Sequence, residues 1–492
     1  MRLTTVDTAR DRDWTHLVEA YLLPIGIPLL LGLGLGVLLA VAIVRESWPA
    51  VFSLLLLIPA AILFSKYPYA SLILWIIAMP FLQTPSGSAY RTLFWVVHRA
   101  IIPIALGTVV INRLLQVTKP QRVRLGPAEF ATVAYLGLAA VNILVSHADP
   151  ITYLYHCYDV VFLPLCLYWF VRLTAPRERD LERLIPVAFF IVLLESIVGV
   201  LSQFVPQVLP SQWMTYDGVR TTGTLAFPHV YSTTLIFFSL VLFQSAMHRK
   251  PGLVRSASLV AFGLGAGGVF LSYSRGSWLG GLVAATGLLL LYPKVILRTA
   301  FILFTLMVIL GSTVLSAQMA YADRRLHSEE TANGRWVLWD AGLQMVQAKP
   351  FFGWGYGNYK ANAWHFQRRV NNTVADKDFN SHNSYIAIAA ELGVPALILF
   401  AFPLLWWMRL TLKVWPRMPQ IGFWSRSLLI VFWMVILDHI TTCFFSDMRS
   451  STYGMGMWWI TLGLIGNMVD TYLTSDDLRP PQWVRRTAQA VE

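Results

Sequence analysis

Charged residues are scarce in this chain. Asp, Glu, Lys and Arg make up 13% of its 492 residues, whereas a soluble globular domain carries about 25%. Hydrophobic residues make up 56% of the chain. Apolar runs of about 20 residues, long enough to cross a bilayer, recur along its length. This composition excludes an ordinary soluble protein, and we expect an all-α polytopic membrane protein.

Cysteines and metal-ligand motifs are also few. The three cysteines, Cys157, Cys166 and Cys443, all lie inside apolar runs. This odd, dispersed set argues against a disulfide framework or a metal cluster and favours small packing residues. The sequence contains no His-Glu-x-x-His, no Cys-x-x-Cys and no Asp-x-Asp on the outer membrane side; these are spacings that hold metals. It therefore predicts neither a metal site nor a cofactor.

Hydropathy predicts about 12–14 transmembrane helices, with about fourteen apolar runs as the upper count. We expect no cleavable signal peptide, because the first run is too long and lacks a small-residue cleavage site. The short runs 48–64 and 68–83 meet at Pro68 and can also form one re-entrant pair. The predicted spans are 21–44, 48–64, 68–83, 93–112, 128–146, 151–171, 184–205, 227–247, 254–272, 277–293, 295–316, 383–408, 424–446 and 452–472.

Lys and Arg are distributed unevenly between the two sides of this topology. With a cytoplasmic N-terminus, most of them fall on cytoplasmic connections, Arg172 among them, and both termini are cytoplasmic. The short outer connections hold only Arg45, Arg91, Arg220, Arg275 and Arg449. The net charge of +12 is therefore mostly topological, and we expect no nucleic-acid partner. The expected regions are an N-terminal tail (1–20), a helical region (21–316), a large outer loop (317–382), C-terminal helices (383–472) and a C-terminal tail (473–492).

The outer loop 317–382 is the only long polar interval in the chain. A helical stripe runs through it, because apolar residues recur at spacings of three and four. Asn333 could cap this helix and Lys349-Pro350 would end it. Such a helix would lie in the membrane interface or pack on the domain as an ordinary loop helix. The stripe consists of Trp336, Trp339, Leu343 and Val346.

Three arginines on the outer side, Arg220, Arg275 and Arg335, are candidates for binding an anionic headgroup. A guanidinium group presents a planar fork of donors that matches phosphate oxygens and stays charged. Two alternatives remain open. Arg275 could simply extend to the lipid headgroups, and Arg220 could be a loop residue paired with Asp217.

His382 stands where the outer loop returns to the membrane. A neutral imidazole there could accept a proton from a hydroxyl group near neutral pH. The alternative is an interfacial or capping histidine, although Ser381 and Asn383 are better helix caps. Tyr385 follows three residues later, on nearly the same face of the expected helix.

Other polar residues could support this site. Arg99, inside the fourth predicted span, could be a further phosphate contact or form structural pairs with Glu195 and Asp438, since ionisable groups in a span rarely face lipid. Glu391 is a weaker alternative base, because a regular helix would turn it away from His382. His229 completes the set of supporting candidates, with Asn383 and Tyr385.

The order and sidedness of these motifs resemble the O-antigen ligase and polymerase superfamily. The resemblance covers about residues 215–400 and is carried above all by the start of the last helical region. The matching stretches are Ser272–Gly276, Asn333-Gly334-Arg335 leading to Lys349-Pro350-Phe351-Phe352-Gly353-Trp354-Gly355, and Ser381-His382-Asn383-Ser384-Tyr385 with Glu391-Leu392-Gly393-Val394-Pro395.

The resemblance implies a C-type glycosyltransferase in the bacterial inner membrane with its active site on the periplasmic face. It implies a donor glycan on undecaprenyl diphosphate, held by Arg220 and Arg275, and transfer that is metal-independent and inverting. His382 would activate the acceptor hydroxyl. Expected partners are the donor, a glycan or lipid A core acceptor, membrane lipids and a chain-length regulator protein.

The acceptor decides between related activities. We expect a polysaccharide polymerase acting on O-antigen or exopolysaccharide, because the cytoplasmic connections and tail are longer than a compact ligase needs. The alternatives are an O-antigen ligase that transfers glycan to lipid A core and a protein O-oligosaccharyltransferase. A lipid-linked glycan transporter or flippase is a candidate of another class, but the chain shows no convincing internal repeat.

Overall fold

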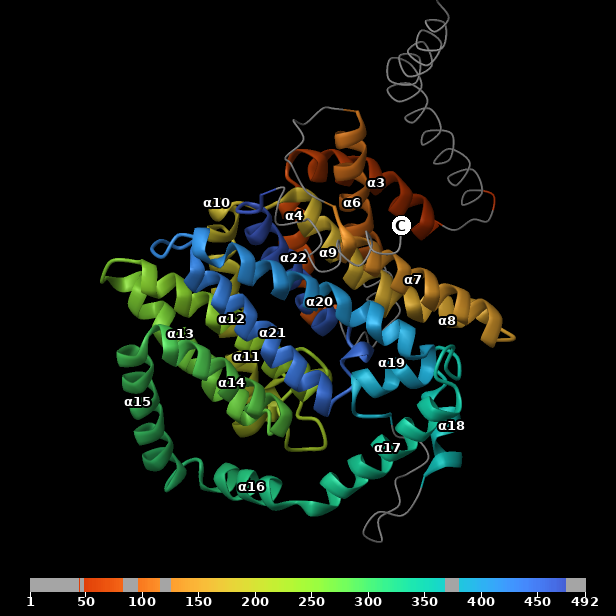
Figure 1. The fold of residues 1–492 in the computed structure, drawn as a ribbon. Coiled ribbons are helices and arrows are strands. Elements are labelled where there is room, and N and C mark those ends of the chain that lie inside the picture. The colour runs from red at the N-terminus through yellow and green to blue at the C-terminus, as the bar shows by residue number, and fades with distance from the viewer. Residues whose placement is uncertain (1–43, 45–47, 83–95, 116–124, 368–379, 475–492) are drawn as a thin grey trace, which may run out of the picture. The chain divides into compact units, whose positions relative to one another are not determined.

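The computed structural model describes residue 44 and residues 48–82, 96–115, 125–367 and 380–474 (Figure 1). The predicted span 21–44, apart from its last residue, and most of the two tails lie outside these ranges. Over the described residues the fold is helical and contains no strand, only one isolated bridge between Tyr216 and Arg220. The expectation of an all-α polytopic membrane protein is confirmed.

The chain divides into two compact units. The first comprises residues 1–76 and 87–122 and the second residues 77–86 and 123–492. The helices of the first unit are α3 (Trp48–Lys66), most of α4 (Pro68–Leu82), the π-helix η2 (Val96–Ala100) and α6 (Ile101–Leu114). A bend of 110° separates Pro59–Lys66 from Pro68–Leu82, which fits the broken or re-entrant pair that Pro68 predicts.

The second unit contains the remaining helices. They are α7 (Pro127–Ser146), α8 (Pro150–Cys157), η3 (Tyr158–Phe162), α9 (Leu163–Thr174), α10 (Glu178–Glu182), α11 (Ile185–Phe204), η4 (Pro206–Val208), η5 (Ser211–Trp213), α12 (Pro228–His248), α13 (Leu253–Leu271), α14 (Arg275–Leu291), α15 (Pro293–Gly311), α16 (Ser316–His327), α17 (Glu329–Ala348), α18 (Tyr359–Ala363), η6 (Trp364–Phe366), α19 (Ser384–Leu392), α20 (Val394–Val414), η7 (Trp415–Arg417), α21 (Arg426–Phe445), η8 (Met448–Ser450) and α22 (Thr452–Asp470).

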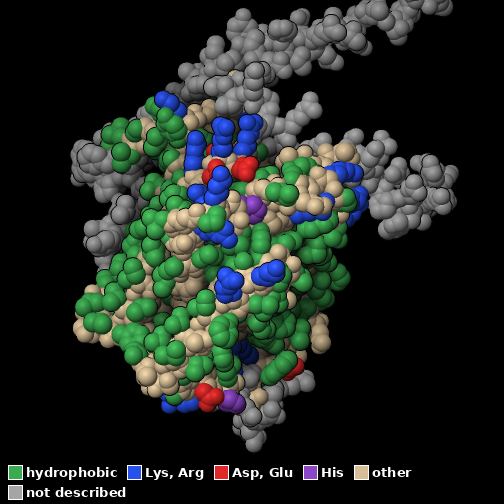
Figure 2. Space-filling model, turned by 90° about the vertical axis from the view of Figure 1, so that its left-hand side faces the viewer, with side chains coloured by type: hydrophobic (Ala, Val, Ile, Leu, Met, Phe, Trp, Pro, Cys, Tyr) green, Lys and Arg blue, Asp and Glu red, His purple; other side chains and the backbone are tan. Residues whose placement is uncertain are grey.

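Eight of the described helices are long and apolar enough to cross a membrane, or nine if the bent pair is one span. The predicted count of about fourteen runs is higher. One reason is that α14 has only 17 residues, which is short for a crossing. On the face shown in Figure 2, hydrophobic side chains dominate the surface, as expected for helices in contact with lipid.

The core of the second unit lies around α12, whose span is 89% buried, and α22, which is buried along almost its whole length. Glycines allow the neighbouring helices to approach closely, as is typical inside membranes. A Cβ atom at Gly276 would meet Phe445 at 2.9 Å, and one at Gly280 would collide with Asp438, so α14 packs tightly on α21.

Arg172 corrects one detail of the predicted topology. It was expected in a cytoplasmic connection, but it lies inside α9 and is fully buried. Its Nε and Nη2 atoms lie 2.8 Å and 2.6 Å from carboxylate oxygens of Glu129 and Asp470, and its guanidinium lies 4.6 Å from the ring of Trp407. A charge is stable there because it is paired and hydrogen-bonded.

The large outer loop is mostly helical. In Figure 1, α16 and α17 continue from α15 as an arc that ends near α18 and α19. The expected amphipathic helix is confirmed, but it begins at Glu329, so Asn333 lies inside it and does not cap it. The helix ends before Lys349-Pro350 as predicted. Trp336 and Leu343 are 57% and 51% exposed while Trp339 is buried, which is the pattern of an interfacial helix.

Candidate active site

The turn before α19 fixes the position of His382. The Oδ1 atom of Asn383 caps α19 by accepting hydrogen bonds from the amides of Tyr385 and Ile386 at 2.9 Å and 3.0 Å. His382 itself has a φ of 49°, in the left-handed region that non-glycine residues rarely adopt. The backbone therefore holds the imidazole outside the helix.

This geometry corrects the expectation that His382 and Tyr385 share a helix face. Tyr385 is in the first turn of α19, and its hydroxyl donates a hydrogen bond to the carbonyl of Ile440 in α21 at 3.2 Å. Tyr385 and Asn383 therefore stabilise the turn that presents the histidine. Backbone strain at a single residue that the surrounding structure maintains is frequent at active sites.

Arg275 is the first residue of α14, directly after a sharp turn in which Tyr273 has a φ of 49°. Its Nη1 atom donates a hydrogen bond to the carbonyl of Ser328, between α16 and α17, at 3.2 Å. The positive end of the α14 dipole lies at the same place and adds to the attraction for an anion. Arg275 thus connects the bundle to the outer loop.

A cavity of about 430 Å³ lies between α14, α17 and α21. Arg275 and Arg335 both line it. Its other walls are apolar and aromatic, with the rings of Trp339 and Phe444 5.0 Å apart. A cavity with two guanidinium groups and an aromatic lining suits a ligand that has an anionic part and an apolar part.

Arg335 is half-buried and, within the described part of the chain, has no carboxylate partner. Burial, and then the positive charges of Arg275, Arg325 and Arg220, lower the pKa of Arg335 to about 10. Three arginines therefore act electrostatically on Arg335, and Arg325 also acts on Arg275. Such a concentration of like charge is stable when an anion binds to it.

Arg325 is a member of this cluster that sequence reasoning missed. It lies in α16, within the mixed-charge start of the outer loop. Because several charged residues surround it in the sequence, nothing there distinguishes it from an ordinary surface arginine. Its Nε atom is buried without a hydrogen-bond partner among the described residues.

Arg220 is already paired in this structure. Its Nη2 and Nε atoms lie 2.7 Å and 2.8 Å from Oδ2 of Asp217, and its guanidinium lies 4.9 Å from the ring of Tyr216. The ion pair that the sequence left open therefore forms. An anion at Arg220 would compete with Asp217, although Arg220 still lies close enough to influence Arg335 and His382.

A buried carboxylate anchors the loop that carries Arg220. Glu195 in α11 accepts hydrogen bonds from the amide and the hydroxyl of Thr224, at 2.9 Å and 2.5 Å. Gln203 donates to the carbonyl of Val219 and to the hydroxyl of Thr221. Glu195 therefore has a structural role in the loop, and the predicted pairing of Glu195 with Arg99 is not needed to satisfy it.

The environment keeps His382 neutral. Burial, and then the positive charges of Arg335 and Arg220, lower the pKa of His382 to about 4, while Asp447 opposes the shift. A histidine with this pKa is a neutral base at pH 7. His229, at the start of α12, lies within electrostatic range of His382, Arg220 and Arg335, so this supporting candidate belongs to the same cluster.

Asp447 and Arg449 are further site residues that the sequence did not single out. Nε and Nη2 of Arg449 donate to the two carboxylate oxygens of Asp447 at 2.9 Å and 2.7 Å, and Nη1 contacts Glu391 at 2.7 Å. Burial alone would raise the pKa of Asp447, but Arg449 lowers it. The sequence signal is the spacing Asp447-x-Arg449 in a short outer connection, where Arg449 by itself indicates only topology.

The same connection is fastened to the histidine turn. The amide of Met448 donates to the hydroxyl of Ser384, and that hydroxyl donates to the carbonyl of Ser446. Asp447 therefore sits beside the residues that follow His382. Glu391 is ion-paired with Arg449 and accepts a hydrogen bond from the amide of Tyr359, which favours a structural role over that of an alternative base.

The backbone amides of the glycine-rich stretch after α17 donate hydrogen bonds within the protein and do not form an anion site. The amides of Trp354 and Gly355 donate to the carbonyls of Ala390 and Glu391 at the end of α19, both at 2.9 Å. The amide of Tyr356 donates to the side chain of Asn142 in α7. These donors are therefore unavailable to a phosphate group.

Arg99 lies in the first unit, in η2, whereas the residues above lie in the second. Its role as a further phosphate contact stays a prediction. Among the described residues, no group of three or more His, Cys, Asp or Glu side chains is arranged to hold a metal ion.

Part of the chain matches a known protein family. Residues 260–401 match the family model described as O-antigen ligase, which confirms the resemblance stated from the motifs. The matched segment contains Arg275, Arg335 and His382, whereas Arg220, Asp447 and Arg449 lie outside it. No curated protein matches the chain.

Proposed function

We propose that the chain is a metal-independent, inverting glycosyltransferase of lipid-linked glycans, and the match of residues 260–401 to the O-antigen ligase family model supports this. Its donor is a glycan on undecaprenyl diphosphate, and the reaction takes place at the periplasmic face of the bacterial inner membrane. The preferred activity is that of an O-antigen or exopolysaccharide polymerase. Transfer to lipid A core or to a protein hydroxyl is the alternative, and the acceptor distinguishes them.

The observation that carries the proposal is the arginine cluster beside His382. Arg275, Arg325 and Arg220 act electrostatically on Arg335, and the described residues give Arg335 no carboxylate partner. A diphosphate carries the charge that such a cluster attracts, and guanidinium groups match its oxygens. The aromatic walls of the adjoining cavity suit the apolar start of a polyprenyl chain.

The proposed reaction is a single displacement. His382 takes the proton from an acceptor hydroxyl, whose oxygen forms a bond to the anomeric carbon of the donor sugar. The bond from that carbon to the diphosphate oxygen breaks, and undecaprenyl diphosphate leaves. The negative charge that develops on the leaving oxygen is stabilised by the arginines, which are already oriented before the reaction.

Asp447 completes this assignment. When His382 gains the proton it becomes an imidazolium ion, and the neighbouring arginines oppose that charge. The carboxylate of Asp447 is the group that favours it. The bound diphosphate acts in the same sense, so the histidine becomes a better base once the donor is present.

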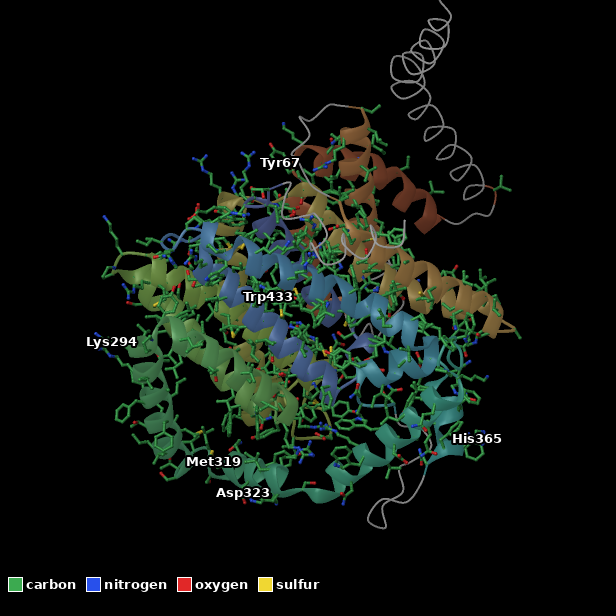
Figure 3. All side chains as sticks on the ribbon, viewed as in Figure 1. Tyr67, Lys294, Met319, Asp323, His365 and Trp433 are labelled. Atoms are coloured by element: carbon green, nitrogen blue, oxygen red, sulfur yellow. The ribbon has the colours of Figure 1, made fainter. Side chains whose placement is uncertain are left out.

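The decisive experiment is turnover by the purified protein in detergent, with a lipid-linked repeat unit as donor and EDTA present. We expect longer glycans and released undecaprenyl diphosphate. A His382→Ala variant should lose roughly 10²–10⁴-fold in kcat, the usual contribution of a general base, while still binding the donor. His365→Ala is the matched control, because that side chain is exposed in the same loop (Figure 3) and its ring contacts that of Trp364.

Two results would contradict the proposal. Turnover of His382→Ala at the wild-type rate would remove His382 from the mechanism. Movement of the lipid-linked glycan across a vesicle membrane without new glycosidic bonds would instead indicate a transporter.

A further inference from the structure

A second cavity lies in the second unit, between α12, α13, α14 and α15. It has a volume of about 310 Å³, at the lower end of the range of roughly 300–1,000 Å³ that is usual for ligand sites. Its lining is almost entirely apolar; representative residues are Leu240, Phe262, Trp278, Ala285, Ile296 and Leu303. We call it the α12–α15 groove.

The groove begins close to the arginine cluster. Trp278, at its outer end, is three residues into α14 from Arg275. Its indole stacks on Phe270 and donates hydrogen bonds to the carbonyls of Val269 and Phe270, which fixes this end of the wall. From Trp278 to Leu288 the lining of α14 extends over about 15 Å. That is about one leaflet of the bilayer core, which is about 30 Å thick in total.

The helices α14 and α15 come together at the inner end of the groove. A tight connection at Tyr292 joins α14 to α15, and the lining residues of α15 come from its first half, from Ile296 to Leu303. Figure 3 shows Lys294 at this end of α15 and Met319 and Asp323 on α16, past its other end. The helix α15, which forms one wall of the groove, is therefore followed by α16 and α17, which carry Arg325 and Arg335.

The groove exists because residues with small or no side chains line its facing walls. Gly265 and Ala266 contribute from α13, and Gly281 and Ala285 from α14. An apolar groove about one leaflet long, whose outer end at Trp278 lies about one helical turn from Arg275, fits a long flexible hydrocarbon chain attached to an anionic head. We infer that the α12–α15 groove binds the isoprenoid tail of the lipid carrier whose diphosphate lies at Arg275 and Arg335. This inference rests on the proposed function.

The experiment fills the groove. Ala285→Trp places an indole in it from α14, and Ala266→Trp does so from α13. Leu282→Trp is the matched control, because Leu282 is 65% exposed, lies in the same helix and is not part of the lining. Thermal unfolding in detergent identifies any variant that fails to fold, and the two walls give independent variants.

The first readout is donor preference. The same glycan is supplied on undecaprenyl diphosphate and on dimethylallyl diphosphate, whose single isoprene unit is too short to fill the groove, and kcat/KM is measured for each. We expect the preference for the undecaprenyl donor to fall at least tenfold in Ala285→Trp and Ala266→Trp and to stay at the wild-type value in Leu282→Trp. An unchanged preference in both groove variants would overturn the inference.

The second readout is binding, which separates this inference from the proposed function. Native mass spectrometry with added undecaprenyl diphosphate should show an adduct for the wild type and Leu282→Trp that is lost in the groove variants. This result would support the groove even if the wild type transferred no glycan. Retention of the adduct in the groove variants, or equal displacement of it by phosphatidylglycerol, would identify an ordinary acyl-chain surface and overturn the inference.

Discussion

At the scale of single residues, the site depends on charges that repel each other. Arg335 is surrounded by Arg275, Arg325 and Arg220, and its pKa is lowered to about 10 by burial and by these neighbours. The same positive field keeps His382 neutral. An anion relieves the repulsion and raises the basicity of the histidine at once, so donor binding and proton transfer are coupled through these residues.

The pH dependence of Arg335→Gln tests this coupling. A positive neighbour disfavours the imidazolium form, so removing it raises the pKa of His382 from about 4 toward its ordinary value. Since the neutral form is the base, activity is present above this pKa and lost below it. The acid limb of kcat/KM, which reports the free enzyme, should move to higher pH in Arg335→Gln.

The control is Arg324→Gln, because Arg324 is exposed on α16 and lies over the ring of Tyr321. Its acid limb should coincide with that of the wild type. In the wild type the acid limb of kcat should lie at higher pH than that of kcat/KM, because the bound diphosphate favours the imidazolium. Coincident limbs would show that the diphosphate does not lie near His382.

At the scale of elements, the helix predicted to follow the outer loop is in fact two helices. The sequence predicts one span over 383–408, but the structure has α19 and α20 with a break at Gly393. Gly393 has a φ of 88°, and Pro395 follows in the first turn of α20. At the break, the amide of Val394 donates a hydrogen bond to the carbonyl of Pro350 at 2.7 Å. The break therefore holds the segment that leads into the glycine-rich stretch.

Gly353 should be intolerant of a side chain. It has a φ of 65°, and a Cβ atom there would collide with the backbone of Glu391. We expect Gly353→Ala to destabilise the protein by about 1–3 kcal/mol, the usual cost of overpacking, with left-handed strain in addition. Thermal unfolding in detergent measures the change in stability. Activity should fall as well, because Glu391 is ion-paired with Arg449, which contacts Asp447 in the site.

Gly334 provides the opposite case. It lies inside α17, and a Cβ atom there would meet nothing within 4 Å. Gly334→Ala should therefore stabilise the protein slightly, by up to about 1 kcal/mol, because alanine is the better helix former. A loss of stability in Gly334→Ala as large as that in Gly353→Ala would contradict the packing described at Gly353.

At the scale of the whole molecule, the arrangement in the membrane can be tested with two exposed residues. Asp323 lies on α16 and Lys294 in the first turn of α15, and both are marked in Figure 3. The positive-inside distribution predicts opposite sides of the membrane for them. In intact cells, a membrane-impermeant maleimide should label Asp323→Cys and not Lys294→Cys.

The native cysteines give this experiment a low background, since Cys157, Cys166 and Cys443 are free and buried. Permeabilised cells serve as the control, in which both introduced cysteines should react. Labelling of Lys294→Cys from outside would reverse the predicted orientation and place the arginine cluster on the cytoplasmic face.

The amino-acid sequence alone determined the helical membrane class, because apolar runs and the asymmetry of Lys and Arg are properties of local composition. It also predicted the amphipathic helix around Trp336 and Trp339, whose periodicity is local. The helix start was misplaced at Asn333, since tertiary contacts decide whether a helix continues past a cap.

Only the tertiary structure decided which polar residues meet. Arg325, Asp447 and Arg449 join the site through contacts between segments far apart in the chain, and Arg172 becomes a buried core residue for the same reason. The pKa of a histidine or an arginine depends on burial and on the charges nearby, and neither can be deduced from the spacing of residues along the chain.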